Sequence, residues 1–216
     1  MPLIMHFIKA PRFYDSYLEE YISLPTTDLN KIDRYYFWME KVKTGQTRCS
    51  FKEWSGLSKE DLPHEEVVKY YKDFYVQKPI IFDGDCEEAQ VQTIFTDLAR
   101  VVKMNQLVNW AMKHVTNGEV ELNCWYEISK EQLKDLCARL KRTRRCLSFV
   151  GEELIVKDKW LANELLPLMK EVPLFWGTDE YDSVYARQVA DAYEIIQNVL
   201  NATDFEKESI YLVRVN

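Results

Sequence analysis

Residues 180–200 read EYDSVYARQVADAYEIIQNVL, and residues 209–215 read SIYLVRV. In the first segment, residues that recur at helical spacing would share one largely apolar face of a helix. They are Tyr181, Val184, Tyr185, Gln188, Val189, Ala192, Ile195, Ile196 and Val199. This pattern predicts a long amphipathic helix that packs on a core. The second segment alternates β-branched and polar residues, which predicts a final strand. The C-terminal part of the chain therefore combines a long helix with a strand.

Other segments of the sequence also show local patterns that are typical of helices or strands. Ser129 and Gln132 form a capping box before a helix that we expect to end near Arg142. Residues 87–116 are predicted to form one long central helix, because their apolar side chains recur at helical spacing. Further strands are expected at residues 3–8 and 120–128, and further helices at 27–43, 63–74 and 157–166.

Strands at both ends and in the middle, joined through long helices, predict an α+β fold. We expect a small mixed or antiparallel sheet packed against several long helices. No linker divides the sequence, so residues 1–216 are expected to form a single α+β domain.

Composition narrows the classes of function and partner. The formal net charge of −7 argues against nonspecific nucleic-acid binding, which needs a basic surface. No apolar run approaches the roughly 20 residues of a membrane-spanning helix, so no membrane partner is expected. The 5 cysteines are dispersed and odd in number, which predicts free thiols in a reducing cytoplasm. Six Trp and thirteen Tyr indicate either a strongly aromatic core or aromatic recognition surfaces.

The sequence contains none of the common catalytic or phosphate-binding motifs. Its three histidines are isolated, and no thiol or imidazole spacing fits a structural metal, so we expect no metal site and no cofactor. The acidic run from Asp83 to Glu88 lacks the glycine and the final glutamate of an EF-hand loop, which favours a solvated loop.

Two asparagines stand out in the apolar stretch after residue 100. Asn105 and Asn109 are four residues apart, with Lys103 and Trp110 beside them. A buried amide without partners costs about 1–3 kcal/mol, so each amide needs hydrogen-bond partners. The pair belongs either to a structural network or to the polar floor of a pocket.

The segment from Leu174 to Asp182 reads LFWGTDEYD. Its aromatic residues precede Gly177 and the polar start of the final helix, and they could stack a planar ligand while helix amides meet its anionic part. Alternatively, the aromatic rings pack in the core, and Thr178 or Asp179 caps the helix. The basic run that includes Arg144 and Arg145 fits either a phosphate group or the negative end of a helix.

These two segments carry a resemblance to a known group. Residues 102–111 read VKMNQLVNWA and resemble a block R-K-A-N-x-I-H-x-W-F, while residues 174–182 resemble F-F-F-G-S-T-x-Y-D. Both blocks are typical of a widespread group of small, largely uncharacterised proteins of tailed bacteriophages. Val102 and Val108 stand where that group has Arg and His. The resemblance covers about residues 100–215 and implies a viral protein acting in the host cytoplasm.

The resulting function hypothesis is a phage accessory protein that binds and sequesters a small nucleotide signal of host defence, such as a cyclic dinucleotide, without catalysis. A homo-oligomer with sites between subunits would suit this role. The alternatives are an acidic inhibitor that binds a host protein, and an enzyme that processes nucleotides with Asp83, Asp85 or Asp182. The candidate ligand-binding residues are Lys103, Asn105, Asn109, Trp110, Arg144, Arg145, Phe175, Trp176, Thr178, Tyr181 and Asp182. We also predict that Asn105 and Asn109 lie near residues 175–182.

Overall fold

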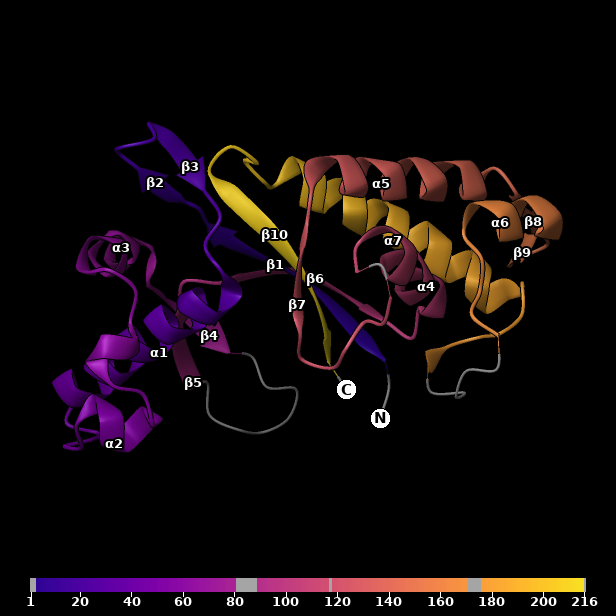
Figure 1. The fold of residues 1–216 in the computed structure, drawn as a ribbon. Coiled ribbons are helices and arrows are strands. Elements are labelled where there is room, and N and C mark those ends of the chain that lie inside the picture. Colours follow the sequence, from indigo (N-terminus) through magenta and orange to yellow (C-terminus); the bar gives the residue numbers. More distant parts are fainter. Residues whose placement is uncertain (1–2, 81–88, 117, 171–175, 216) are drawn as a thin grey trace. The chain divides into compact units, whose positions relative to one another are not determined.

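The computed structural model describes residues 3–80, 89–116, 118–170 and 176–215 (Figure 1). The chain divides into two compact units, of which unit 1 comprises Met1–Lys9 and Asp97–Asn216, and unit 2 comprises Ala10–Thr96. The predicted α+β fold class is confirmed. Unit 2 is an insertion in the sequence of unit 1.

Unit 1 contains the main sheet and the helices that cover it. Its strands are β1 (Ile4–Pro11), β6 (Thr96–Val102), β7 (Trp125–Ile128), β8 (Leu147–Val150), β9 (Glu153–Val156) and β10 (Glu208–Val215). Its helices are α4 (Asn105–His114), α5 (Lys130–Arg144), α6 (Lys159–Leu165) and α7 (Ser183–Asn201). Four strands form an antiparallel sheet in the order β6-β1-β10-β7, while β8 and β9 pair as a separate hairpin.

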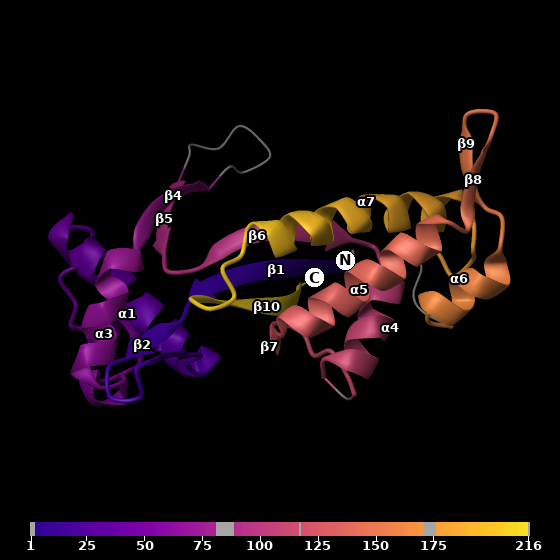
Figure 2. The ribbon, with the colours of Figure 1, turned by 90° about the horizontal axis from the view of Figure 1, so that it is seen from above.

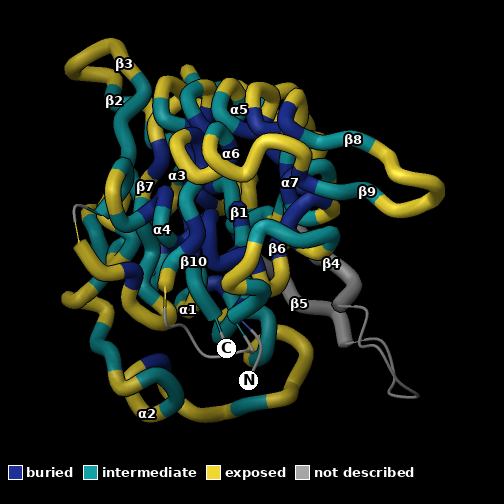
Figure 3. The backbone as a smooth tube through the Cα atoms, turned by 90° about the vertical axis from the view of Figure 1, so that its right-hand side faces the viewer, coloured by how far each residue is buried: buried dark blue, intermediate teal, exposed yellow. Residues whose placement is uncertain are grey.

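The core of unit 1 lies between this sheet and its helices. Strand alternation places Met5 and Phe7 of β1, with Ile210 and Leu212 of β10, in one buried cluster with the apolar faces of α4, α5 and α7. Helices α5 and α7 lie side by side along the sheet (Figure 2). The buried stretches of β1 and β10 and the inward sides of these helices are visible in Figure 3. Burial of this apolar surface is the main stabilising contribution to the unit.

Unit 2 is built from short elements. They are β2 (Phe13–Asp15), β3 (Glu20–Ile22), α1 (Thr26–Lys43), α2 (Phe51–Ser55), η1 (Lys59–Asp61), α3 (Glu65–Tyr71), η2 (Lys72–Phe74), β4 (Val76–Ile80) and β5 (Ala89–Thr93). Aromatic rings hold them together, since Tyr35 of α1 contacts Phe51 of α2 edge to face at 5.5 Å between ring centroids. Phe13 of β2 likewise contacts Tyr70 of α3 at 5.2 Å. Much of the aromatic content therefore serves packing in this unit.

The prediction of one helix over residues 87–116 is wrong. The described part of this segment contains β5, β6 and α4. Ile94, Leu98 and Val101 fit helical spacing, but the β-branched residues around them favour a strand, and pairing with β1 decides the outcome. Lys103 then takes a left-handed conformation with φ of 57°, which ends the strand and lets α4 begin at Asn105.

Two other expected elements are shorter than predicted. The strand expected at residues 120–128 is paired as β7 only from Trp125, because Asn123 adopts φ of 58° and interrupts it. The helix expected at residues 157–166 forms as α6, with Asp158 as its N-cap. The β8–β9 hairpin before it was not predicted as a pair, although Gly151 supplies the positive φ that its turn requires.

The expectation of one domain over residues 1–216 stays a prediction, because compactness alone does not establish how many units fold independently. Within the described ranges, no helix has the length and apolarity needed to cross a membrane.

Candidate functional site

Asn105 is the first residue of α4 and is completely buried. Its Nδ2 donates to the Thr178 carbonyl at 2.5 Å, and its Oδ1 accepts from the Met169 amide at 3.2 Å. The side chain thus joins α4 to the connection between α6 and α7. The predicted proximity of Asn105 to residues 175–182 is confirmed, and both polar groups of its amide are used in holding the fold together.

Asn109 joins the same connection one helical turn later. Its Nδ2 donates to the Pro167 carbonyl at 2.9 Å. Among the described residues, this hydrogen-bond partner of Asn109 therefore lies before the 175–182 segment, not in it. Each asparagine supports the interpretation of a structural network more directly than that of a pocket floor.

Lys103 contributes its backbone to the network. Its carbonyl accepts from Gln188 Nε2 of α7 at 2.7 Å, and Gln106 Nε2 donates to Gln188 Oε1 at 3.1 Å. Gly177 lies against this carbonyl, because a Cβ at that position would be 1.9 Å from the Lys103 oxygen. The tight approach explains a glycine in the aromatic segment.

Three other candidate residues organise the start of α7. Asp182 is its N-cap and accepts from the Tyr185 amide at 2.9 Å. Thr178 Oγ1 lies 3.1 Å from the Asp182 carboxylate. The Tyr181 hydroxyl donates to Asn163 at 2.8 Å and accepts from the Leu168 amide at 3.2 Å, while burial raises its pKa. These contacts give Thr178, Tyr181 and Asp182 structural roles.

Trp110 belongs to the core. Its side chain is 3% exposed, and its Nε1 donates to Asp135 of α5 at 3.4 Å. The indole also stacks on His114, whose pKa is lowered by burial. A ligand therefore has no open face of this ring on which to stack.

Trp176 has a different setting, because it lines a pocket of about 460 Å³ in unit 1. The pocket is bounded by Val108, Met112, Glu119, Val120, Glu121, Leu122, Met169, Trp176 and Arg214. Its walls are mainly apolar and come from α4, the segment before β7, the α6–α7 connection and β10. This composition, a concave apolar site with a few polar groups, is typical of small-molecule pockets.

The pocket contains one close pairing of a cation with a ring. The Arg214 guanidinium carbon lies 4.4 Å from the Trp176 ring centroid, within the range of a cation–π interaction. Arg214 Nη1 donates to the Val120 carbonyl at 2.8 Å, which fixes the guanidinium. Its Nε is buried and has no hydrogen-bond partner among the described residues. Glu119 and Glu121 place negative charge at the same pocket.

Of the remaining candidate residues that the structure describes, Arg144 and Arg145 do not line this pocket. Arg144 stacks over Tyr193, with 4.7 Å between the guanidinium carbon and the ring centroid, and Arg145 is the exposed C-cap of α5. Phe175 and the acidic run 83–88, including Asp83 and Asp85, lie outside the described residues. Within the described ranges, no group of three or more possible ligand residues could hold a metal ion. The described cysteines, Cys49, Cys124, Cys137 and Cys146, are free thiols.

No protein-family model, curated protein sequence or solved structure matches this chain. The resemblance to tailed-bacteriophage proteins therefore stays an expectation from the two sequence blocks.

Sequence reasoning found Trp176 but missed Arg214, which faces it. A detectable signal was present, since Arg214 lies in a largely apolar final strand whose other charged residue, Glu208, is at its first position. Charged side chains inside such a strand need a specific partner. The partner itself could not be inferred, because Trp176 is remote in the sequence and on another element.

Proposed function

We propose that this protein is a non-enzymatic binding protein that holds a planar, nucleotide-like ligand in the Trp176–Arg214 pocket. The observation that most directly supports this proposal is the pairing of the Trp176 indole ring with the fixed Arg214 guanidinium in one open, largely apolar pocket. Stacking of a base on an aromatic side chain contributes about 1–3 kcal/mol and does not require a particular base.

The pocket's size and walls support this choice of ligand. Its volume of about 460 Å³ lies in the range of small-molecule sites. Val108, Met112 and Met169 offer apolar contact to a ring, and the Arg214 cation supplies a local positive charge in a chain of net charge −7. Glu119 and Glu121 favour ligand groups that donate N–H hydrogen bonds, such as the edge of a purine base.

Binding without catalysis is favoured by what lines the pocket. Its described lining residues include no histidine, cysteine or serine, and the proposal assigns its two carboxylates, Glu119 and Glu121, to hydrogen bonds with the ligand. We further propose that the protein is a bacteriophage accessory protein that acts in the host cytoplasm. There it would sequester a nucleotide immune signal, such as a cyclic dinucleotide. The sequence blocks at residues 102–111 and 174–182 motivate this further proposal.

The direct test combines native mass spectrometry with calorimetric titration against a panel of nucleosides, mononucleotides and cyclic dinucleotides. We expect one class to bind and to be recovered chemically unchanged after denaturation of the protein. Recovery of a chemically converted product would show that the protein is an enzyme and not a simple binding protein. Failure of every planar ligand in the panel to bind would overturn the proposal.

The residue-level test is Trp176→Ala. Loss of a stacking contact of about 1–3 kcal/mol predicts a several-fold to hundredfold weaker affinity. Because Trp176 is only partly buried, we expect the thermal unfolding transition to persist. Trp54→Ala in unit 2 is the matched control and should leave affinity unchanged. A collapsed transition for Trp176→Ala would assign the indole to the core and remove the stacking role.

A further inference from the structure

The Trp176–Arg214 pocket contains more negative than positive charge. Glu119 and Glu121 line it together with Arg214, which is the only cation among its described lining residues. A phosphate group in the pocket would meet two carboxylates for one guanidinium, and like charges brought together are unfavourable. The charges of the pocket therefore favour an uncharged part of a nucleotide, its base, over the phosphate.

The charged groups of the pocket are not used up by one another. Within the described ranges, Arg214 forms no ion pair with either glutamate. Glu121 accepts a hydrogen bond from the Cys124 thiol at 3.3 Å, while Glu119 is exposed. Arg214 donates through Nη1 to the Val120 carbonyl, and its buried Nε has no partner there. Because a guanidinium has five N–H donors, Arg214 retains donors for a ligand.

A guanidinium and a carboxylate in one pocket require a ligand with both acceptors and donors. Arginine can only donate hydrogen bonds, and an ionised glutamate can only accept them. Guanine offers both edges, because its O6 and N7 atoms are acceptors that an arginine fork commonly binds as a pair. Its N1–H and 2-amino groups are adjacent donors that fit the two oxygens of one carboxylate. Adenine has no 2-amino group and presents an acceptor at N1, which a carboxylate repels.

We propose that the Trp176–Arg214 pocket selects guanine among the nucleotide bases. This inference rests on the proposed function and adds the identity of the base and the way it is held. Arg214 donates to guanine O6 and N7, and Glu119 accepts from N1–H and the 2-amino group. A base held in the plane of the guanidinium lies over the same face of the Trp176 indole, so stacking and hydrogen bonding act together. The sugar, attached at N9 on the remaining edge, keeps its phosphates in solvent.

The ligand side of this contact is tested by calorimetric titration of the full chain with nucleosides. We expect guanosine to bind at least about tenfold more tightly than adenosine, within the range of discrimination by a bidentate contact. Inosine lacks the 2-amino group and 7-deazaguanosine lacks N7, so each should bind several-fold more weakly than guanosine. The second comparison tests the Arg214 contact without altering the protein. GMP should bind about as well as guanosine, because its phosphate stays in solvent.

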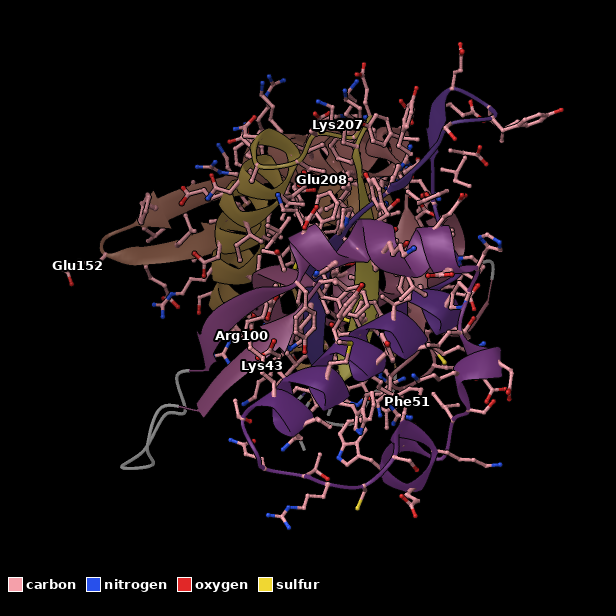
Figure 4. The ribbon with its side chains drawn as sticks, turned by 90° about the vertical axis from the view of Figure 1, so that its left-hand side faces the viewer. Lys43, Phe51, Arg100, Glu152, Lys207 and Glu208 are labelled. Atoms are coloured by element: carbon pink, nitrogen blue, oxygen red, sulfur yellow. The ribbon has the colours of Figure 1, made fainter. Side chains whose placement is uncertain are left out.

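The protein side is tested by Glu119→Gln. This change keeps the size of the side chain and replaces one carboxylate oxygen with an amide donor, which opposes the donors of guanine. We expect at least about tenfold weaker binding of guanosine, little change for adenosine, and an unaltered thermal transition, because Glu119 is exposed. Glu152→Gln is the matched control and should bind guanosine normally. Figure 4 shows Glu152 at the far end of the β8–β9 hairpin, with its side chain directed away from the helices.

The outcomes separate guanine selection from the proposed function. Equal binding of guanosine and adenosine would overturn guanine selection and leave the binding of planar ligands intact. The same holds if 7-deazaguanosine binds as tightly as guanosine, or if the preference for guanosine persists in Glu119→Gln. Much tighter binding of GMP than of guanosine would place the phosphate in the pocket and would also contradict the inference. Failure of every nucleoside and nucleotide to bind would overturn both proposals.

Discussion

At the scale of single residues, Gly177 makes the tightest approach in the network around α4. Its φ is 122°, and a Cβ there would be 1.9 Å from the Lys103 carbonyl oxygen. Asn105 and Gln188 fasten the same two segments through hydrogen bonds. Because the obstacle is backbone, a side chain at residue 177 cannot be accommodated by a rotamer change.

We therefore predict that Gly177→Ala lowers the free energy of unfolding by about 3 kcal/mol or more, from strain and forced separation of the two segments. Gly151→Ala is the control, because Gly151 also has positive φ but open space around it. That change should cost only about 1 kcal/mol. Urea denaturation of both variants measures the difference. Equal losses would show that the Lys103 contact has no energetic weight.

At the scale of elements, the capping box of α5 also contributes to the contact between α5 and α4. Ser129 accepts from the Gln132 amide at 3.1 Å, and Gln132 Oε1 accepts from the Ser129 amide at 2.8 Å. The Gln132 side-chain amide also donates to the His114 carbonyl at the end of α4. The capping box thus fixes both the beginning of α5 and its contact with α4.

Ser129→Ala should destabilise unit 1 by about 1 kcal/mol, as expected for loss of an N-cap side chain. Ser183→Ala, at the first residue of α7 after its Asp182 cap, is the control and should change stability by less than about 0.5 kcal/mol. The midpoints of urea denaturation at constant slope provide the comparison. If the two variants unfold alike, then the α5 cap contributes nothing beyond helix propensity.

At the scale of the whole molecule, unit 2 is inserted in the sequence between two strands that are neighbours in the sheet of unit 1. Strands β1 and β6 pair with each other, although 84 residues separate Pro11 from Thr96. Antiparallel neighbours can be joined by a two-residue turn. The core cluster of unit 1 consists of residues from unit 1 itself.

We predict that replacing residues 10–96 with an Asn-Gly turn between Lys9 and Asp97 yields a protein that still folds cooperatively. Circular dichroism and a single sharp thermal transition would establish this. The Trp176–Arg214 pocket should be retained, because its described lining lies wholly in unit 1. A shortened chain without a cooperative transition would instead support a single domain over residues 1–216.

The sequence by itself determined the elements whose signals are local. The amphipathic face of residues 180–200, the Ser129 capping box and the alternation of residues 209–215 correspond to α7, the start of α5 and β10. The α+β class follows from these elements. Local signals suffice here because caps and periodic faces depend on neighbours within a few residues.

Only the tertiary structure determined the conformation of segments whose helix and strand preferences were balanced. It also determined the contacts of residues whose partners are distant in the sequence. Residues 96–102 fit both helical and strand spacing, and pairing with β1 made them a strand. Asn105 was recognised as anomalous, but only folding supplied its partners Thr178 and Met169. Arg214 meets Trp176 because β10 and the α6–α7 connection converge on one pocket. Such contacts join residues far apart in sequence, and no local pattern encodes them.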